Sequence, residues 1–185
     1  MNCVKAVLLF LLPGMLLLAS CNIFPSPEVA VSRYYDLSIP ERVPLDGKNV
    51  LVLPFASNSG DRYKMALREG NSIRSSEASK WIMPPGSLMT KYLRLAFRSE
   101  PGMRQSRQEI TLSGTVSAFE SQKGEAILGL TYKLRPSVGT GMKEFSRTIL
   151  LREKFEGSSA EAFAAAMSKA AEKAAESIAA DIKKL

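Results

Sequence analysis

Few residues of this 185-residue chain could carry out chemistry. It contains no histidine and two cysteines, which excludes a Ser-His-Asp triad, a Cys-His pair and a histidine metal site. Two cysteines cannot supply a four-ligand zinc site or a disulfide framework. Four carboxylates lie in separate loops and strand edges, and we expect solvated surface groups: Asp36, Glu41, Asp46 and Asp61. The sequence therefore predicts no enzyme and no catalytic or metal-binding residue.

Cys21 is the residue for which the sequence predicts a chemical modification. It follows a 14-residue apolar run, Ala6 to Ala19, which spans about 21 Å as a helix and is short of the ~30 Å bilayer core. The end of this run, Leu18-Ala19-Ser20-Cys21, resembles the lipobox of bacterial lipoproteins. That resemblance implies cleavage before Cys21, a diacylglycerol on its sulfur and an N-acyl chain on the new amine, with no other cofactor. An ordinary signal peptide with an incidental cysteine is the alternative.

The chain is expected to have three parts. Residues 1–20 are the lipoprotein signal peptide, residues 21–31 are a lipidated tether containing Pro25 and Pro27, and residues 32–185 form a single domain. The nine residues after Cys21 can extend to about 30 Å at most, which keeps the domain near its membrane. In the lipoproteins that the lipobox resembles, Asp after the cysteine favours retention in the inner membrane. Asn22 here therefore favours the outer membrane, with the domain facing the periplasm.

The first half of the domain reads as strands. Alternation over Arg33 to Ile39 predicts a strand with Tyr35, Leu37 and Ile39 on one face. The continuous apolar run Asn49 to Phe55 predicts a strand buried on both faces. Lys64 to Arg68 and Ile73 to Ser76 flank the turn dipeptide Gly70-Asn71 and predict a hairpin.

The second half combines helices with a strand meander. Apolar spacing predicts a helix over Ser87 to Arg98 that Pro84-Pro85 starts, and strands over 110–118, 126–134 and 145–155. A capping box from Ser158 to Glu161 starts a closing helix with an Ala-rich stripe. We therefore predict an α+β fold in two layers, with one mixed or antiparallel β-sheet and two long helices packed on one face.

A family resemblance rests on the segment around the tryptophan. Leu67 to Arg74, followed by Lys80-Trp81-Ile82-Met83-Pro84-Pro85-Gly86, resembles the ABC-type transport auxiliary lipoproteins of the PqiC group. Lys80 departs from the arginine usual in that family, and lysine lacks the planar fork of arginine. The resemblance implies an outer-membrane accessory that docks an MCE-type (mammalian cell entry) lipid transport system. The implied partners are an MCE-domain protein, an ABC permease and ATPase complex, and outer-membrane lipid; self-association is left open.

A second resemblance lies earlier in the chain. The strand Asn49 to Phe55 with the loop Ser57 to Asp61 resembles the TolB-N-terminal-like lipoproteins, which include the curli-secretion component CsgG and activators of penicillin-binding proteins. That resemblance implies a role in secretion or in regulating cell-wall synthesis. The predicted strands are too short for a secretion pore, which makes this the alternative.

The positive charge of the chain is concentrated in one region. Its formal net charge is +7, and the excess falls between Arg62 and Arg107. An exported lipoprotein is not expected to bind nucleic acid, so the expected partner is an anionic lipid surface or an acidic protein, with a scattered, solvated charge surface as the alternative. Trp81 either anchors a partner or packs the helix onto the sheet. The candidate partner-binding residues are Arg74, Lys80, Trp81, Pro84, Pro85, Lys91, Arg94 and Arg98.

Overall fold

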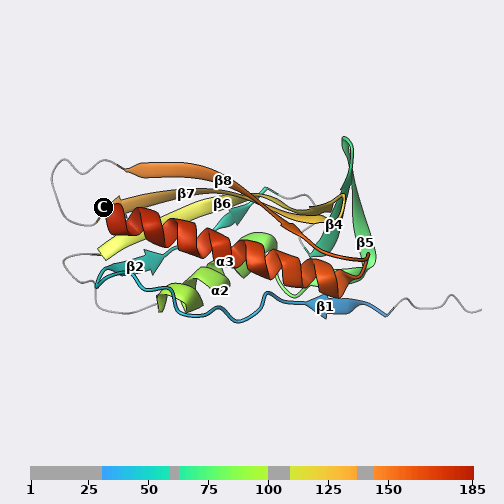
Figure 1. Ribbon diagram of the computed structural model, residues 1–185, viewed down its shortest axis with the longest axis horizontal. Coiled ribbons are helices and arrows are strands. Elements are labelled where there is room, and N and C mark those ends of the chain that lie inside the picture. Colours follow the sequence, from blue (N-terminus) through green and yellow to red (C-terminus); the bar gives the residue numbers. More distant parts are fainter. Residues whose placement is uncertain (1–30, 59–62, 100–108, 137–143) are drawn as a thin grey trace, which may run out of the picture. The chain divides into compact units, whose positions relative to one another are not determined.

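An eight-stranded mixed sheet forms one layer of the structure, and two helices cover one of its faces (Figure 1). This is the α+β architecture that the sequence predicts. The computed structural model describes residues 31–58, 63–99, 109–136 and 144–185. From Ser32 onward these residues form one unit.

The predicted meander forms one side of the sheet. It consists of β6 (Glu109–Gln122), β7 (Glu125–Pro136) and β8 (Phe145–Lys154), each antiparallel to the next, and ends in the edge strand β8. Alternate residues, such as Leu112, Leu128 and Leu130, are fully buried toward the helices. The opposite face carries threonine, serine and charged side chains. The meander is confirmed; β6 and β7 are longer than predicted, and β8 ends one residue before the predicted end.

Two short strands lie beside β6 and run parallel to it: β2 (Asn49–Val52) and β3 (Ala56–Ser57). Val50 and Val52 point into the core, whereas Leu53 is 38% exposed. The prediction of a strand buried on both faces is therefore wrong. Only one face is covered, because both helices pack on the same side of the sheet.

The first strand is shorter than predicted. β1 spans Arg33–Tyr35, and Ile39 is 88% exposed instead of sharing a buried face with Leu37. After β1 the backbone is held by the helices: Ser38 N donates to Ser168 Oγ (3.0 Å) and Val43 N donates to Ala96 O (3.0 Å). These bonds replace the strand pairing that the alternation predicted.

The hairpin is confirmed, and it extends beyond the predicted residues. β4 (Lys64–Glu69) and β5 (Ser72–Trp81) are joined at Gly70, whose φ of 60° suits the first central position of a two-residue turn. Figure 1 shows the green hairpin rising from the sheet on the side away from the helices. Its last three residues, Ser79 to Trp81, pair with β1.

The helices are α2 (Pro85–Phe97) and α3 (Ala160–Lys184). The N-cap of α3 is Ser159, whose Oγ accepts from Ala162 N (3.1 Å). The predicted capping box beginning at Ser158 is therefore wrong by one residue. The predicted stripe is confirmed, because every member is buried: Phe163, Met167, Ala170, Ala171, Ala174, Ile178 and Ile182.

A buried polar cluster fixes the end of α3 to the sheet. The Asp181 side chain is 4% exposed and accepts from Tyr132 Oη (2.6 Å), Arg147 Nη1 (2.9 Å) and Lys184 Nζ (3.1 Å). Burial raises the pKa of Asp181, but these three donors outweigh it and leave the pKa below its usual value. Burial and the bond to Asp181 raise the pKa of Tyr132 to about 12. The ionised carboxylate is thus the form that the folded protein favours.

Candidate docking site

Trp81 joins the hairpin to the rest of the core. It is fully buried at the end of β5 and makes edge-on contacts with Phe119 (centroids 5.0 Å apart) and Phe163 (5.6 Å). Its indole Nε1 is the one buried side-chain nitrogen or oxygen in the described residues that has no hydrogen-bond partner. In this structure Trp81 packs a helix onto the sheet and offers no surface to a partner.

The two prolines start α2. Pro84 is the N-cap, with extended backbone at φ −55° and ψ 148°, and Pro85 occupies the first helical turn. Proline suits this place because the missing N–H would have no helical partner there. The carbonyl of Pro84 accepts from Leu88 N (2.9 Å), which closes the first turn. Pro85 is buried and Pro84 is half-buried, so both act mainly on the geometry of the helix start.

Gly86 and Thr90 bring α2 into contact with the segment between β2 and β3. A Cβ at Gly86 would lie 2.4 Å from Phe55 O, closer than a carbon can approach. Thr90 Oγ1 donates to Gly86 O (2.7 Å) and accepts from Phe55 N (2.8 Å). Sequence reasoning missed both residues, although a glycine directly after Pro84-Pro85 was a usable signal. The tryptophan-proline segment and the Asn49–Phe55 run thus form one packed structure.

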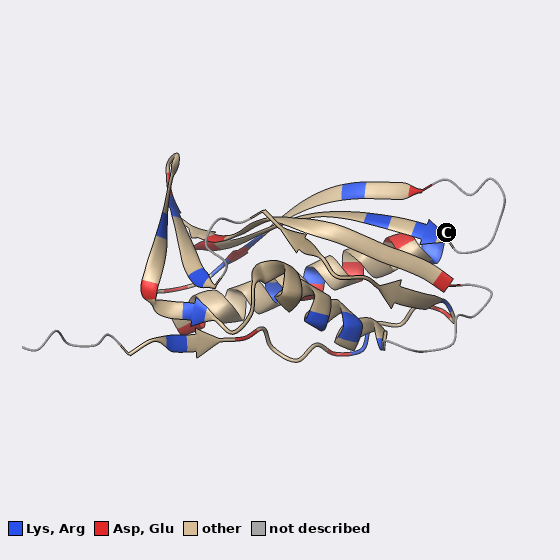
Figure 2. Cartoon of the chain, turned by 180° about the vertical axis from the view of Figure 1, so that it is seen from behind, with Lys and Arg blue, Asp and Glu red and all other residues tan. Residues whose placement is uncertain are grey.

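α2 and its C-cap carry three basic candidates, and Figure 2 marks the lysine and arginine positions of the chain in blue. Lys91 forms an ion pair with Asp36, and Arg94 Nε donates to Val52 O (3.1 Å). Arg98 is the exposed C-cap of the helix, with φ 52°. Lys91 and Arg94 therefore hold neighbouring segments to α2, and Arg98 points to solvent.

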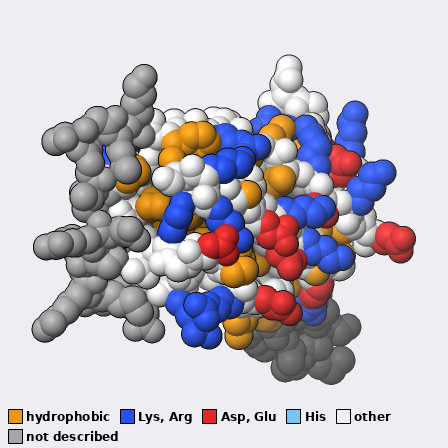
Figure 3. All heavy atoms as spheres, turned by 60° about the vertical axis from the view of Figure 1, so that its left-hand side comes forward, with side chains coloured by type: hydrophobic (Ala, Val, Ile, Leu, Met, Phe, Trp, Pro, Cys, Tyr) orange, Lys and Arg blue, Asp and Glu red, His pale blue; other side chains and the backbone are white. Residues whose placement is uncertain are grey.

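Part of the basic charge in the described region is paired within the domain. Lys64 pairs with Glu77 (2.6 Å), and Arg68 forms a two-pronged pair with Glu120. Figure 3 shows one face on which blue and red side chains are intermingled. Acids of the domain thus offset part of the basic charge of these residues. Arg62, Arg104 and Arg107 lie outside the described residues.

Arg74 and Lys80 lie on β5. The Arg74 side chain is 71% exposed, and its contact with Glu69 is a loose 3.5 Å. Lys80 is half-buried and stands between Tyr34 and Lys64 on neighbouring strands. Of the eight candidates, the structure places Arg74 and Lys80 on the hairpin and Lys91, Arg94 and Arg98 on α2. The two groups belong to different parts of the surface.

Arg74 borders a cleft of about 490 Å³ between the hairpin and the start of α3. Apolar side chains of Met65, Leu67, Phe155 and Phe163 line it, and serine hydroxyls surround them. Its volume lies in the range typical of ligand pockets, about 300–1,000 Å³. Arg74 is the one charged residue among those lining the cleft. Sequence reasoning did not find this site, because it joins segments far apart in the chain.

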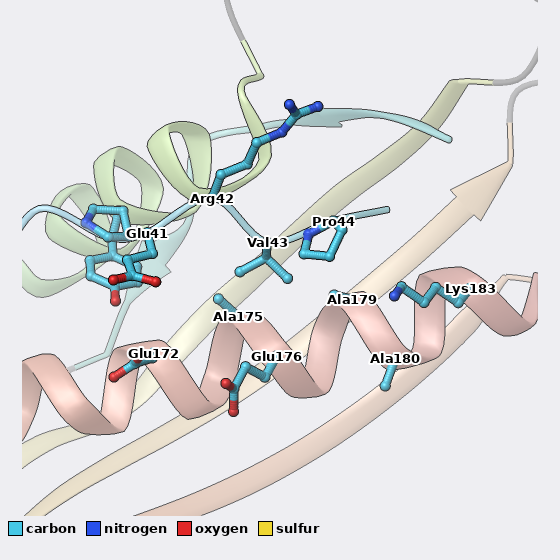
Figure 4. A pocket seen from close by; sticks show the side chains of 12 residues that line it. Glu41, Arg42, Val43, Pro44, Glu172, Ala175, Glu176, Ala179, Ala180 and Lys183 are labelled. Atoms are coloured by element: carbon cyan, nitrogen blue, oxygen red, sulfur yellow. The ribbon is translucent and has the colours of Figure 1, made fainter. Parts of the chain in front are cut away.

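A second groove, of about 330 Å³, lies between α3 and residues 40–44 (Figure 4). Glu172 and Glu176 reach it from α3, and Glu41 reaches it from the loop. Burial and these two α3 carboxylates raise the pKa of Tyr92 to about 12. Arg42, Tyr92 and Lys183 also line this groove, so its carboxylates lie among basic and phenolic side chains. Among the described residues, no cluster of potential ligands could hold a metal ion, and no helix is long and apolar enough to cross a membrane.

Comparison with known proteins identifies the family. The model of the ABC-type transport auxiliary lipoprotein component family matches residues 60–179, well over half of the chain. The chain belongs to this family. The match includes the hairpin, Trp81, the proline pair and both helices up to Ala179. As a member of the auxiliary lipoprotein family, the protein is a membrane-anchored lipoprotein that accompanies ABC-type transport.

Solved structures share the fold of this auxiliary lipoprotein. Protein XCC0632 from Xanthomonas campestris has a TM-score of 0.66 at 17% identity, with 80% of this chain and 93% of that chain covered. An uncharacterised protein has a TM-score of 0.61 at 15% identity, with 83% and 97% covered. No curated protein matches. At these identities the similarity shows the fold alone.

Proposed function

We propose that this auxiliary lipoprotein is the outer-membrane docking component of an ABC/MCE-type system that moves lipid between membranes. Family membership over residues 60–179 carries the proposal. The described residues support a binding role, because they present an exposed hairpin that borders a cleft with an apolar lining. The domain holds a periplasm-spanning MCE-domain protein at the membrane surface, and the ABC permease and ATPase drive transport from the other side.

The proposed anchor is Cys21, which carries the diacylglycerol and the N-acyl chain. One acyl chain gives only marginal membrane binding, whereas two or three anchor a protein stably, because each buried CH₂ contributes about 0.8 kcal/mol. Metabolic labelling with an alkyne fatty acid should mark the native chain and not the Cys21→Ser variant. The variant should also leave the membrane fraction. A labelled, sedimenting Cys21→Ser chain would show that the anchor lies elsewhere.

The proposed location and partner can be tested together. Membranes separated on a sucrose gradient should place the native lipoprotein in the outer-membrane fraction. Cross-linking in intact cells, followed by purification, should recover the MCE-domain protein in the same complex. Recovery in the inner-membrane fraction, or no MCE-domain protein in the cross-linked material, would contradict the proposal.

A further inference from the structure

The β5 strand has an edge that the described chain leaves open. β1 pairs only with Ser79 to Trp81, and Ser32 Oγ donates to Glu77 O at 3.5 Å. Beyond that point, no described strand pairs with Ser72 to Ser76 on the side away from β4. This stretch is exposed on both faces apart from half-buried Ser76. It contains no proline or lysine, the residues that commonly protect open edges.

The main-chain groups of this edge are arranged to bind another strand. A two-residue turn makes Glu69 and Ser72 a hydrogen-bonded pair, and such pairs alternate along an antiparallel ladder. Ile73 and Ser75 are then non-hydrogen-bonded positions opposite Arg68 and Ala66. Their N–H and C=O groups therefore point away from β4, toward the open edge.

The cleft lies beside this edge. Leu67 and Arg74 are directly opposite each other on β4 and β5, so their side chains share one face of the hairpin, and both line the cleft. Opposite them, Phe155 and Phe163 close the cleft from the end of β8 and the start of α3. A strand placed along Ser72 to Ser76 would thus direct every second side chain toward this apolar lining.

We propose that the open edge of β5 binds an extended, acidic segment of the partner protein by β-strand addition. Main-chain bonds to Ile73 and Ser75 hold the segment, a carboxylate meets Arg74, and an alternate apolar side chain enters the cleft. Charge selects the occupant, because Arg74 is exposed and is the one charged residue of the lining. The open main-chain donors and acceptors favour a peptide, since an acyl chain could not satisfy them. The inference rests on the docking role proposed above and names how the partner is held.

Two labelled peptides provide the probes. One is acetyl-Thr-Val-Glu-Val-Thr-Val-Glu-Val-amide, and the other has lysine in place of both glutamates. Binding to the full mature lipoprotein in neutral detergent micelles is measured by fluorescence anisotropy. We expect at least tenfold tighter binding of the acidic peptide, with the preference reversed by Arg74→Glu. Arg42→Glu reverses the charge of another exposed arginine, which lies outside the cleft, and should leave the preference unchanged.

Backbone chemistry separates strand addition from simple charge attraction. In one peptide the residues whose N–H groups face β5 are N-methylated, which should abolish binding. In a second peptide the intervening residues are N-methylated, which should change the affinity less than threefold. Bound peptide should slow hydrogen exchange at the Ile73 and Ser75 amides and leave the Arg74 amide, which is paired with Leu67, unchanged. Equal effects of the two methylation patterns, or no protection at Ile73 and Ser75, would overturn the proposal.

Two further outcomes are distinguishable from these. Arg74-dependent binding to phosphatidylglycerol vesicles, without peptide binding, would make the site a lipid headgroup site and would overturn strand addition. If Arg74→Glu still cross-links to the MCE-domain protein as efficiently as the native chain, this docking mode is wrong while the proposed function stands. If neither the native chain nor Arg42→Glu cross-links, the proposed function itself fails.

Discussion

Replacing Trp81 tests whether this tryptophan is a packing element or a contact surface. Trp81→Ala removes a fully buried ring and its contacts with Phe119 and Phe163, a class of change that costs about 3–5 kcal/mol. Trp81→Phe keeps an aromatic ring against both neighbours. It also removes a buried N–H that has no partner, a group whose burial costs about 1–3 kcal/mol. We therefore expect Trp81→Phe to change the free energy of unfolding by less than about 1.5 kcal/mol.

Unfolding in urea is monitored by far-UV circular dichroism, with all variants made in a Cys21→Ser background. Tryptophan fluorescence is unsuitable, because the chain has a single tryptophan and the signal would disappear when it is replaced. Ile82→Ala, at the adjacent and 40% exposed position, is the control and should cost under about 1 kcal/mol. If Trp81→Phe destabilises as much as Trp81→Ala, the indole N–H has a partner and the argument fails. A cost below about 1 kcal/mol for Trp81→Ala would place the ring outside the core.

Three further predictions concern contacts elsewhere in the domain. Gly86→Ala places a Cβ against the backbone of the segment between β2 and β3. In urea unfolding it should destabilise the protein by about 1–3 kcal/mol, whereas Ser87→Ala should not. Equal effects of the two substitutions would contradict the close approach of α2 to that segment. Asp181 has a lowered pKa, so its stabilisation is complete above its unfolded value of about 3.9 and is lost as pH falls through the lower folded value. Thermal melts from pH 6 to pH 2 should therefore show a flatter decline for Asp181→Asn, and parallel curves would refute this. Lys91→Ala breaks a partly exposed ion pair with Asp36. It should lower the free energy of unfolding in urea by no more than about 1 kcal/mol, and by less at high salt. A larger loss that does not depend on salt would show that the aliphatic part of Lys91 packs against the domain.

Local patterns were sufficient to predict most of the helices and strands. The meander, the hairpin and both helices follow from periodicity and turn residues within about fifteen positions of one another. The errors came where a distant segment decides the outcome. Ser38 binds Ser168 on α3 instead of a strand, and Leu53 is exposed because both helices pack on the other face. No alternation within 33–39 or 49–55 contains that information.

The candidate site could be predicted only in part, for the same reason. Counting charges along the chain indicates a basic region, but two of the acids that pair with it lie far away in the sequence: Asp36 is 55 positions from Lys91, and Glu120 is 52 positions from Arg68. The cleft likewise joins Leu67 and Arg74 to Phe155 and Phe163. Sequence spacing reveals which residues share an element, whereas pairing across elements requires the fold.

The residues that reveal the family and those available to a partner belong to different parts of the structure. Trp81, Pro85 and Gly86 are buried, so a substitution there alters packing before it alters any contact. Ile73 and Arg74 on β5 are exposed and lie outside the hydrophobic core cluster, so their side chains can change at little cost in stability. Two proteins with this fold could therefore share the tryptophan-proline core and still select different partners through the hairpin. If the two sets of residues are separate in this way, exchanging residues 72–76 between two such proteins should by itself exchange their partners.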